Sequence, residues 1–121
     1  MSRPCTVLLL EDQDELRALL SEVLLSAGYN VLTATNGAQA AELCEANMGQ
    51  VNALVCDLHT PGMPTTEFVQ TAVRMNPSVR VVLMSGYPAD WAKLDIPCAH
   101  EFLYKPFSTN KLLSVLGRPT P

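Results

Sequence analysis

The sequence has no long uninterrupted apolar segment and no excess of basic residues. Its apolar runs are short, as at residues 7–10, and no basic segment followed by a long apolar stretch lies near residue 1. These absences argue against a membrane-spanning helix and a signal peptide, so we expect a cytoplasmic domain. Because 12 acidic side chains outnumber 8 basic ones, giving a formal net charge of -4, direct nucleic-acid binding is disfavoured.

Cysteines at disulfide or metal-binding spacing are also absent. The 4 cysteines are widely separated, none forms a C-x-x-C pair, and the 2 histidines are isolated from one another. A structural zinc site is therefore not expected. Cys56 follows apolar residues, which indicates a small buried side chain in the core.

What is present is enough for one domain. The chain has 121 residues, of which 48% are hydrophobic and 17% charged, in line with a single packed core. We expect residues 1–121 to form one domain with its core at about 6–116. Residues 117–121 are interpreted as a tail or the start of a linker.

Five short segments have the character of buried strands: 6–10, 30–34, 53–56, 80–84 and 101–104. Several are continuously apolar, which is typical of strands covered on both faces in a parallel sheet. Between them, helical spacing predicts helices over about 16–27, 36–46, 65–74 and 108–116, and a short one within 89–94. In the second helix, we expect Asn36 as the cap and Ala38, Ala41 and Leu43 toward the sheet.

Alternating strands and helices predict an α/β fold of the (βα)5 type. The expected structure is a five-stranded, doubly wound parallel sheet, flavodoxin-like, with strand order 2-1-3-4-5. In that order the ligand crevice lies at the carboxyl ends of the first and third strands, where the winding direction reverses.

Acidic residues occupy this predicted crevice. Glu11 and Asp12 follow the first strand, and Asp57 ends the third. Like charges brought together favour a bound cation or a catalytic role, and hard oxygen ligands suit Mg2+, with Mn2+ as the alternative. The other interpretation is that the first two belong to an acidic helix start, with Asp12 or Asp14 as the cap.

The ends of the last two strands add a hydroxyl and a cation. Ser85 lies at the end of the fourth strand, and Lys105 follows the fifth, where Pro106 permits a cis peptide bond. A carboxylate nucleophile beside a metal and a lysine has the composition of a site for phosphoryl transfer.

These residues, in their order along the chain, resemble the receiver domain of two-component response regulators, the CheY-like family. The likeness rests on Glu11-Asp12, on Asp57 followed by Pro61-Gly62-Met63, on Ser85-Gly86 and on the segment from Phe102 to Phe107. It covers about residues 6–116. The segments 84–88 and 102–107 are similar to receivers fused to hybrid histidine kinases.

The resemblance implies a role for each matching residue. Asp57 is the expected phosphoacceptor, Ser85 and Lys105 bind the phosphoryl oxygens, and Phe102 is the expected rotameric switch. The implied metal ligands are Glu11, Asp12, Asp57 and the backbone carbonyl of His59. His59 also lies where the family tunes phosphoryl lifetime.

The resemblance further implies a signalling switch that catalyses only its own phosphorylation and dephosphorylation. A histidine kinase or phosphotransfer protein is the expected phosphodonor, with a fused or downstream output domain. The face formed by the fourth helix, fifth strand and last helix is the expected surface for partners or self-association. A stand-alone protein and one domain of a hybrid kinase remain equally compatible with these residues.

Three positions depart from the family pattern: Thr60, Pro64 and Thr65 replace the usual methionine and aspartate-glycine pair. We expect these changes to touch no phosphoryl ligand, and Thr65 or Thr66 to cap the third helix. Two other functions remain as alternatives: a receiver-like binding module without phosphorylation, and an aspartate-nucleophile phosphatase. The phosphatase class requires a second acid two residues beyond the nucleophile, where this chain has His59.

Overall fold

The computed structural model describes residues 5–47, 49–87 and 100–117. In chain order its elements are β1 (Thr6–Leu10), α1 (Asp14–Ser26), β2 (Asn30–Ala34), α2 (Gly37–Ala46), β3 (Val51–Asp57), α3 (Thr65–Met75), β4 (Arg80–Ser85), β5 (His100–Tyr104) and α5 (Thr109–Leu116). The helix expected within 89–94 and the tail after residue 117 lie outside the described residues.

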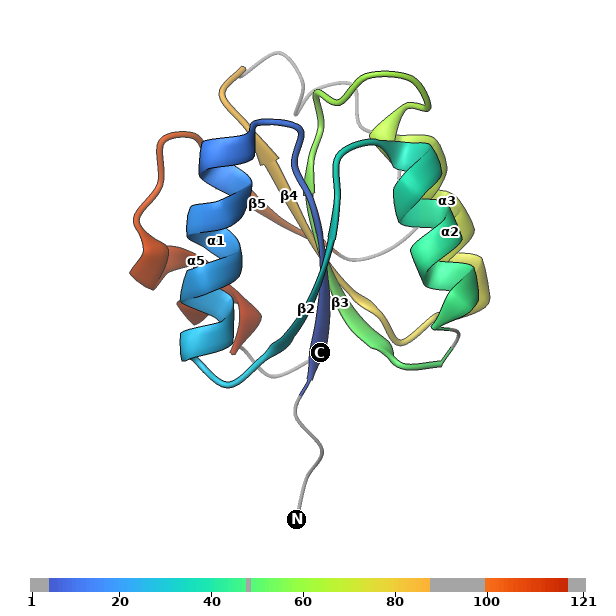
Figure 1. Cartoon of the computed structure of the whole chain (residues 1–121), viewed down its shortest axis with the longest axis horizontal. Coiled ribbons are helices and arrows are strands. Elements are labelled where there is room, and N and C mark those ends of the chain that lie inside the picture. Colours follow the sequence, from blue (N-terminus) through green and yellow to red (C-terminus); the bar gives the residue numbers. More distant parts are fainter. Residues whose placement is uncertain (1–4, 48, 88–99, 118–121) are drawn as a thin grey trace.

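The five strands form one parallel sheet in the order β2-β1-β3-β4-β5, which confirms the predicted fold. In β1, Leu8 lies opposite Leu32 of β2 on one side and Leu54 of β3 on the other. The register with β3 shifts by one residue between Thr6 and Val7. Figure 1 shows α1 and α5 on one face of the sheet and α2 and α3 on the other. The carboxyl ends of all five strands therefore meet along one edge.

Side chains alternate between two cores, one on each face of the sheet. Leu8, Leu54 and Cys56 pack with α2 and α3, whereas Val7 and Val55 pack with α1 and α5. Cys56 is fully buried, as predicted, and burial raises the pKa of its thiol far above the ordinary value. Covered on both faces, β1 and β3 hold the residues that follow them in fixed positions.

One residue of the predicted apolar face of α2 needs correction. In α2 the buried residues are Gly37, Ala40 and Cys44, whereas Ala38 is exposed. Ala41 and Leu43 are partly buried against the core, as expected, so only Ala38 was misplaced, because an alanine-rich helix has little contrast between its faces. Asn36 does cap this helix, because its side chain accepts the backbone N–H of Gln39 at 2.8 Å.

Two predicted helix caps are also wrong. Gln13, and neither Asp12 nor Asp14, occupies the N-cap position of α1. Pro64 occupies that of α3, so Thr65 is the first helical residue and not a cap. Within the described residues, no helix combines the length and apolar character needed to span a membrane.

Candidate functional site

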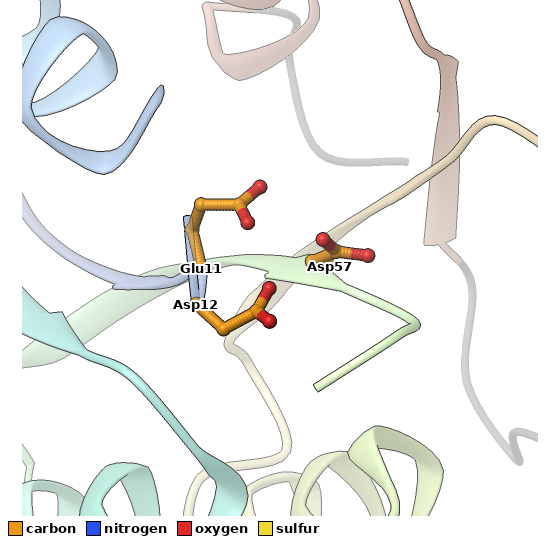
Figure 2. A group of neighbouring side chains, drawn as sticks. All are labelled: Glu11, Asp12 and Asp57. Carbon is orange, nitrogen blue, oxygen red and sulfur yellow. The ribbon is translucent and has the colours of Figure 1, made fainter. Parts of the chain in front are cut away.

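Three carboxylates meet at the carboxyl ends of β1 and β3. Glu11 and Asp12 follow β1 directly, and Asp57 is the last residue of β3. One carboxylate oxygen from each lies within 4.8 Å of the others. Figure 2 shows Glu11 and Asp12 extending from adjacent positions toward Asp57. The structure thus brings together the acidic residues that the strand assignments predicted to meet.

Glu11 is fully buried, and both its backbone N–H and its carboxylate form hydrogen bonds. Its backbone N–H donates to the carbonyl oxygen of Ala34 at 3.0 Å, and its Oε2 accepts the N–H of Gln13 at 3.1 Å. Burial raises the pKa of the Glu11 carboxyl above its usual range, although hydrogen bonds from Lys105 and Gln13 partly oppose this effect. A carboxyl held in this way has little freedom to turn away.

Lys105 bridges the two most buried carboxylates. Its Nζ lies 2.7 Å from Oε1 of Glu11 and 2.7 Å from Oδ2 of Asp57. Burial alone lowers the pKa of Lys105, but the hydrogen bonds to Asp57 and Glu11 outweigh it, so the pKa lies above the ordinary value. The ammonium group therefore stays charged and offsets part of the repulsion between the carboxylates.

Asp57 accepts hydrogen bonds at both oxygens. Oδ2 receives Lys105, and Oδ1 accepts the backbone N–H of His59 at 2.8 Å. Its side chain is 6% exposed, whereas Asp12 is an exposed residue. The cluster therefore combines two buried carboxylates, those of Glu11 and Asp57, with one that is open to solvent, that of Asp12.

The loops after β3 and β4 meet near the acidic cluster. Ser85 is buried, and its Oγ accepts the backbone N–H of Tyr87 at 3.0 Å. The ring of Tyr87 contacts the ring of His59 edge to face, with centroids 4.8 Å apart. These contacts bring the predicted hydroxyl and His59 to the same end of the sheet as the acidic cluster.

Phe102 points outward in this conformation. It is 40% exposed and contacts the His100 ring edge to face, with centroids 4.8 Å apart. Leu103 is buried between Phe102 and Tyr104, both exposed, as strand alternation requires. The peptide bond between Lys105 and Pro106 is cis.

Sequence reasoning missed two residues that hold this site. Arg17 donates from Nη1 to the carbonyl oxygen of Glu11 at 3.1 Å and from Nη2 to Asp14 at 2.6 Å. Thr65 donates its hydroxyl to the backbone carbonyl of Asp57 at 2.6 Å. The pairing of Arg17 with Asp14 could have been predicted, because residues three positions apart are neighbours on a helix.

The donor set fits a hard divalent cation. All three clustered groups are carboxylates, and Mg2+ prefers oxygen ligands completed by water. Asp12 is open to solvent, which leaves room for those waters. The Lys105 ammonium already offsets part of the negative charge, so the cluster has the charge balance for a cation followed by an anionic group.

Comparison with known proteins identifies the receiver domain of response regulators. The family model of the response regulator receiver domain matches residues 7–117. Sensor kinase CckA of Brucella abortus is 32% identical over 96% of this chain, which spans 12% of that kinase. Response regulator receiver protein CpdR of the same species is 29% identical, covering 93% of each chain. The crystal structure of a response regulator receiver protein from Sinorhizobium medicae gives a TM-score of 0.84 at 25% identity, covering 93% of this chain and 90% of its own.

Proposed function

Because this chain belongs to the response regulator receiver domain family, a family of signalling switches, we propose that Asp57 is its phosphoacceptor and that phosphoryl uptake requires Mg2+. The observation that carries this proposal is the cluster of Glu11, Asp12 and Asp57 with Lys105 bridging two of them at 2.7 Å. Neighbouring carboxylates repel one another and oppose folding. Such clusters are therefore typical of sites that bind a cation or carry out catalysis.

In this proposal Glu11, Asp12, Asp57 and the backbone carbonyl of His59 hold the metal ion. When bound, Mg2+ supplies positive charge to the oxygens of the transferring phosphoryl group. Glu11 is buried and its pKa is raised, so it suits contact with the metal or with a metal-bound water better than direct reaction. Asp12 offers its exposed carboxylate from the open side of the cluster.

The transfer itself uses Asp57 as the nucleophile. A carboxylate oxygen of Asp57 attacks the phosphorus of the donor, the O–P bond forms, and the P–N bond to the donor histidine breaks with its electron pair going to nitrogen. The Lys105 ammonium then leaves Asp57 and binds one of the phosphoryl oxygens. Ser85 Oγ binds a second phosphoryl oxygen. The histidine kinase or phosphotransfer protein is the proposed donor.

Intact mass measurement tests the proposal directly. Incubation with acetyl phosphate and Mg2+ should add the mass of one phosphoryl group, and alkaline or hydroxylamine treatment should remove it, as expected of an acyl phosphate. Excess chelator added beforehand should reduce the gain to background, because Lys105 alone cannot neutralise the negative charge of the phosphoryl group beside three carboxylates. An undiminished gain in chelator would contradict the metal role, and a gain resistant to hydroxylamine would exclude an acyl phosphate.

A second part of the proposal concerns Phe102 as the conformational switch. Its ring is 40% exposed in the conformation described, so an inward turn after phosphorylation would change its environment strongly. Such a switch works by packing alone, since phenylalanine lacks the hydroxyl with which tyrosine would form a hydrogen bond.

Fluorine NMR on protein labelled with fluorophenylalanine should detect this turn. Adding Mg2+ and beryllofluoride, which mimics the phosphoryl group, should shift the Phe102 resonance and reduce its sensitivity to solvent. Phe68 provides the internal control, because it is 1% exposed in the core beneath α3 and should keep its resonance. The Phe102→Leu variant assigns the signal. A Phe102 resonance that stays solvent-sensitive would reject the switch.

The surface of β5 and α5 is the proposed place for partners or self-association. Phe102 and Tyr104 expose aromatic rings there, 40% and 47% respectively. The segment 88–99, which includes the predicted fourth helix, lies outside the described residues. A fused or downstream output domain, membership of a hybrid kinase and a cytoplasmic location are further parts of this proposal.

A further inference from the structure

We propose that Thr65 is a positioning residue for the phosphoacceptor, acting through a hydrogen bond from its hydroxyl to the backbone of Asp57. The inference rests on the function proposed above and concerns how this chain keeps Asp57 and the following loop in place. It assigns a role to a residue at which the chain departs from the family pattern, and where sequence reasoning expected only a helix cap.

The contact is short and protected from water. Thr65 Oγ1 donates to the carbonyl oxygen of Asp57 at 2.6 Å, and Thr65 is 1% exposed. Parallel pairing with β4 ends at Asp57, opposite Met84, so the backbone carbonyl at this point lies where the sheet gives way to the loop. A buried carbonyl needs a hydrogen-bond donor, and Thr65 supplies one.

The direction of a neighbouring hydrogen bond follows from this contact. Thr60 Oγ1 and Thr65 Oγ1 lie 3.3 Å apart. A threonine hydroxyl carries one proton, and that of Thr65 points to Asp57, so Thr60 must be the donor to Thr65. Two of the three departures from the family pattern thus form a hydrogen-bonded chain that ends on Asp57. The expectation that they avoid the phosphoacceptor therefore holds for its carboxylate and fails for its backbone.

The loop between these residues is attached to Asp57 at both ends. At its start, His59 donates its backbone N–H to Oδ1 of Asp57 at 2.8 Å, and at its end Thr65 binds the Asp57 carbonyl. The loop also packs tightly against α2, where a Cβ added to Gly37 would lie 2.8 Å from the carbonyl oxygen of Met63. The proposed metal ligand, the His59 carbonyl, lies between the two attachments.

Attachment at both ends lowers the cost of forming the metal site. A loop already held in place loses less conformational freedom when the metal binds, so more of the binding free energy appears as affinity. Removing the Thr65 hydroxyl frees one end of the loop and leaves the Asp57 carbonyl without this donor. The expected result is weaker Mg2+ binding by a folded protein, an effect distinct from lower stability.

Calorimetric titration with Mg2+ tests this on wild type, Thr65→Val and Thr65→Ser, at a temperature well below thermal unfolding. Thr65→Val keeps the shape and removes the hydroxyl, so the Kd for Mg2+ should rise roughly fivefold, the effect of one net hydrogen bond. Thr65→Ser retains the hydroxyl and should restore a Kd near that of wild type. Equal Kd values for wild type and Thr65→Val, or equal weakening in both variants, would overturn the proposal.

Thr71→Val is the matched control. Thr71 also lies on α3 and donates its hydroxyl to a backbone carbonyl, that of Glu67 at 3.2 Å, but it is only half-buried and this hydrogen bond stays within the helix. Its loss should leave the Mg2+ Kd unchanged, whereas weakening equal to that of Thr65→Val would overturn the proposal. If Thr65→Val does not fold, Thr65→Ala against Thr65→Ser makes the same hydroxyl comparison.

The Thr60→Val variant tests the hydrogen-bonded chain. It should weaken Mg2+ binding less than Thr65→Val does, and it should add nothing in the Thr65→Val background, since Thr60 acts only through Thr65. Full additivity would overturn the chain. Wild-type protein that binds no Mg2+ would instead refute the proposed function itself, and this inference with it.

Discussion

Replacing Asp57 with asparagine should leave a folded domain that takes up no phosphoryl group. The amide has nearly the same shape as the carboxylate, and its oxygen can still accept the His59 N–H that now lies 2.8 Å from Oδ1. It lacks the anionic oxygen needed to attack phosphorus, so intact mass after treatment with acetyl phosphate and Mg2+ should show uptake at background. Circular dichroism and thermal unfolding should confirm that the fold is retained.

Asp14→Asn is the control for the loss of one negative charge. Asp14 lies only two residues beyond Asp12, but its side chain is 86% exposed and pairs with Arg17. Uptake by this variant should match that of wild type. Phosphoryl gain by Asp57→Asn at the wild-type rate would place the acceptor on another residue.

The fold was predictable because its strands are covered on both faces. β1 and β2 have the bounds that the apolar segments predicted, the alternation with helices predicted a parallel sheet, and the observed strand order is the common one that was assumed. β3, β4 and β5 extend beyond the predicted segments, to Val51–Asp57, Arg80–Ser85 and His100–Tyr104, because polar residues such as Asn52 and Ser85 interrupt or end the apolar runs. In α2 only Ala38 was placed on the wrong face, because alanines occur on both faces of that helix and give little contrast.

The acidic site was predictable at the level of the backbone and not of the side chains. Parallel strands bring their carboxyl ends to one edge, so Glu11 and Asp57 were expected to be close. That Lys105 lies between them depends on a side-chain conformation that no spacing rule specifies. The role of Thr65 was missed for a related reason: its hydroxyl was assigned to the helix that follows, whereas it reaches back to the strand.

The Lys105→Met variant should be strongly destabilised in the absence of Mg2+. Methionine preserves most of the apolar stem but removes the ammonium, leaving Glu11 and Asp57 buried side by side without their shared cation. Breaking a buried ion pair from one side costs about 3 kcal/mol of unfolding free energy, toward the lower end of the usual range because Lys105 is partly exposed. Urea denaturation measures this loss. Lys111→Met, which removes an exposed lysine from α5, should cost little.

The pH and metal dependence of that loss should identify its cause. Burial raises the pKa of Glu11, and the hydrogen bond from Lys105 lowers it, so removing Lys105 should raise the pKa further. The folded variant then keeps a proton that the unfolded chain releases, and its stability should fall as the pH rises above the ordinary pKa of a glutamate, about 4.3. Saturating Mg2+ should recover much of the loss, because the metal replaces the missing charge. A deficit independent of both pH and Mg2+ would assign the role of Lys105 to packing instead of charge.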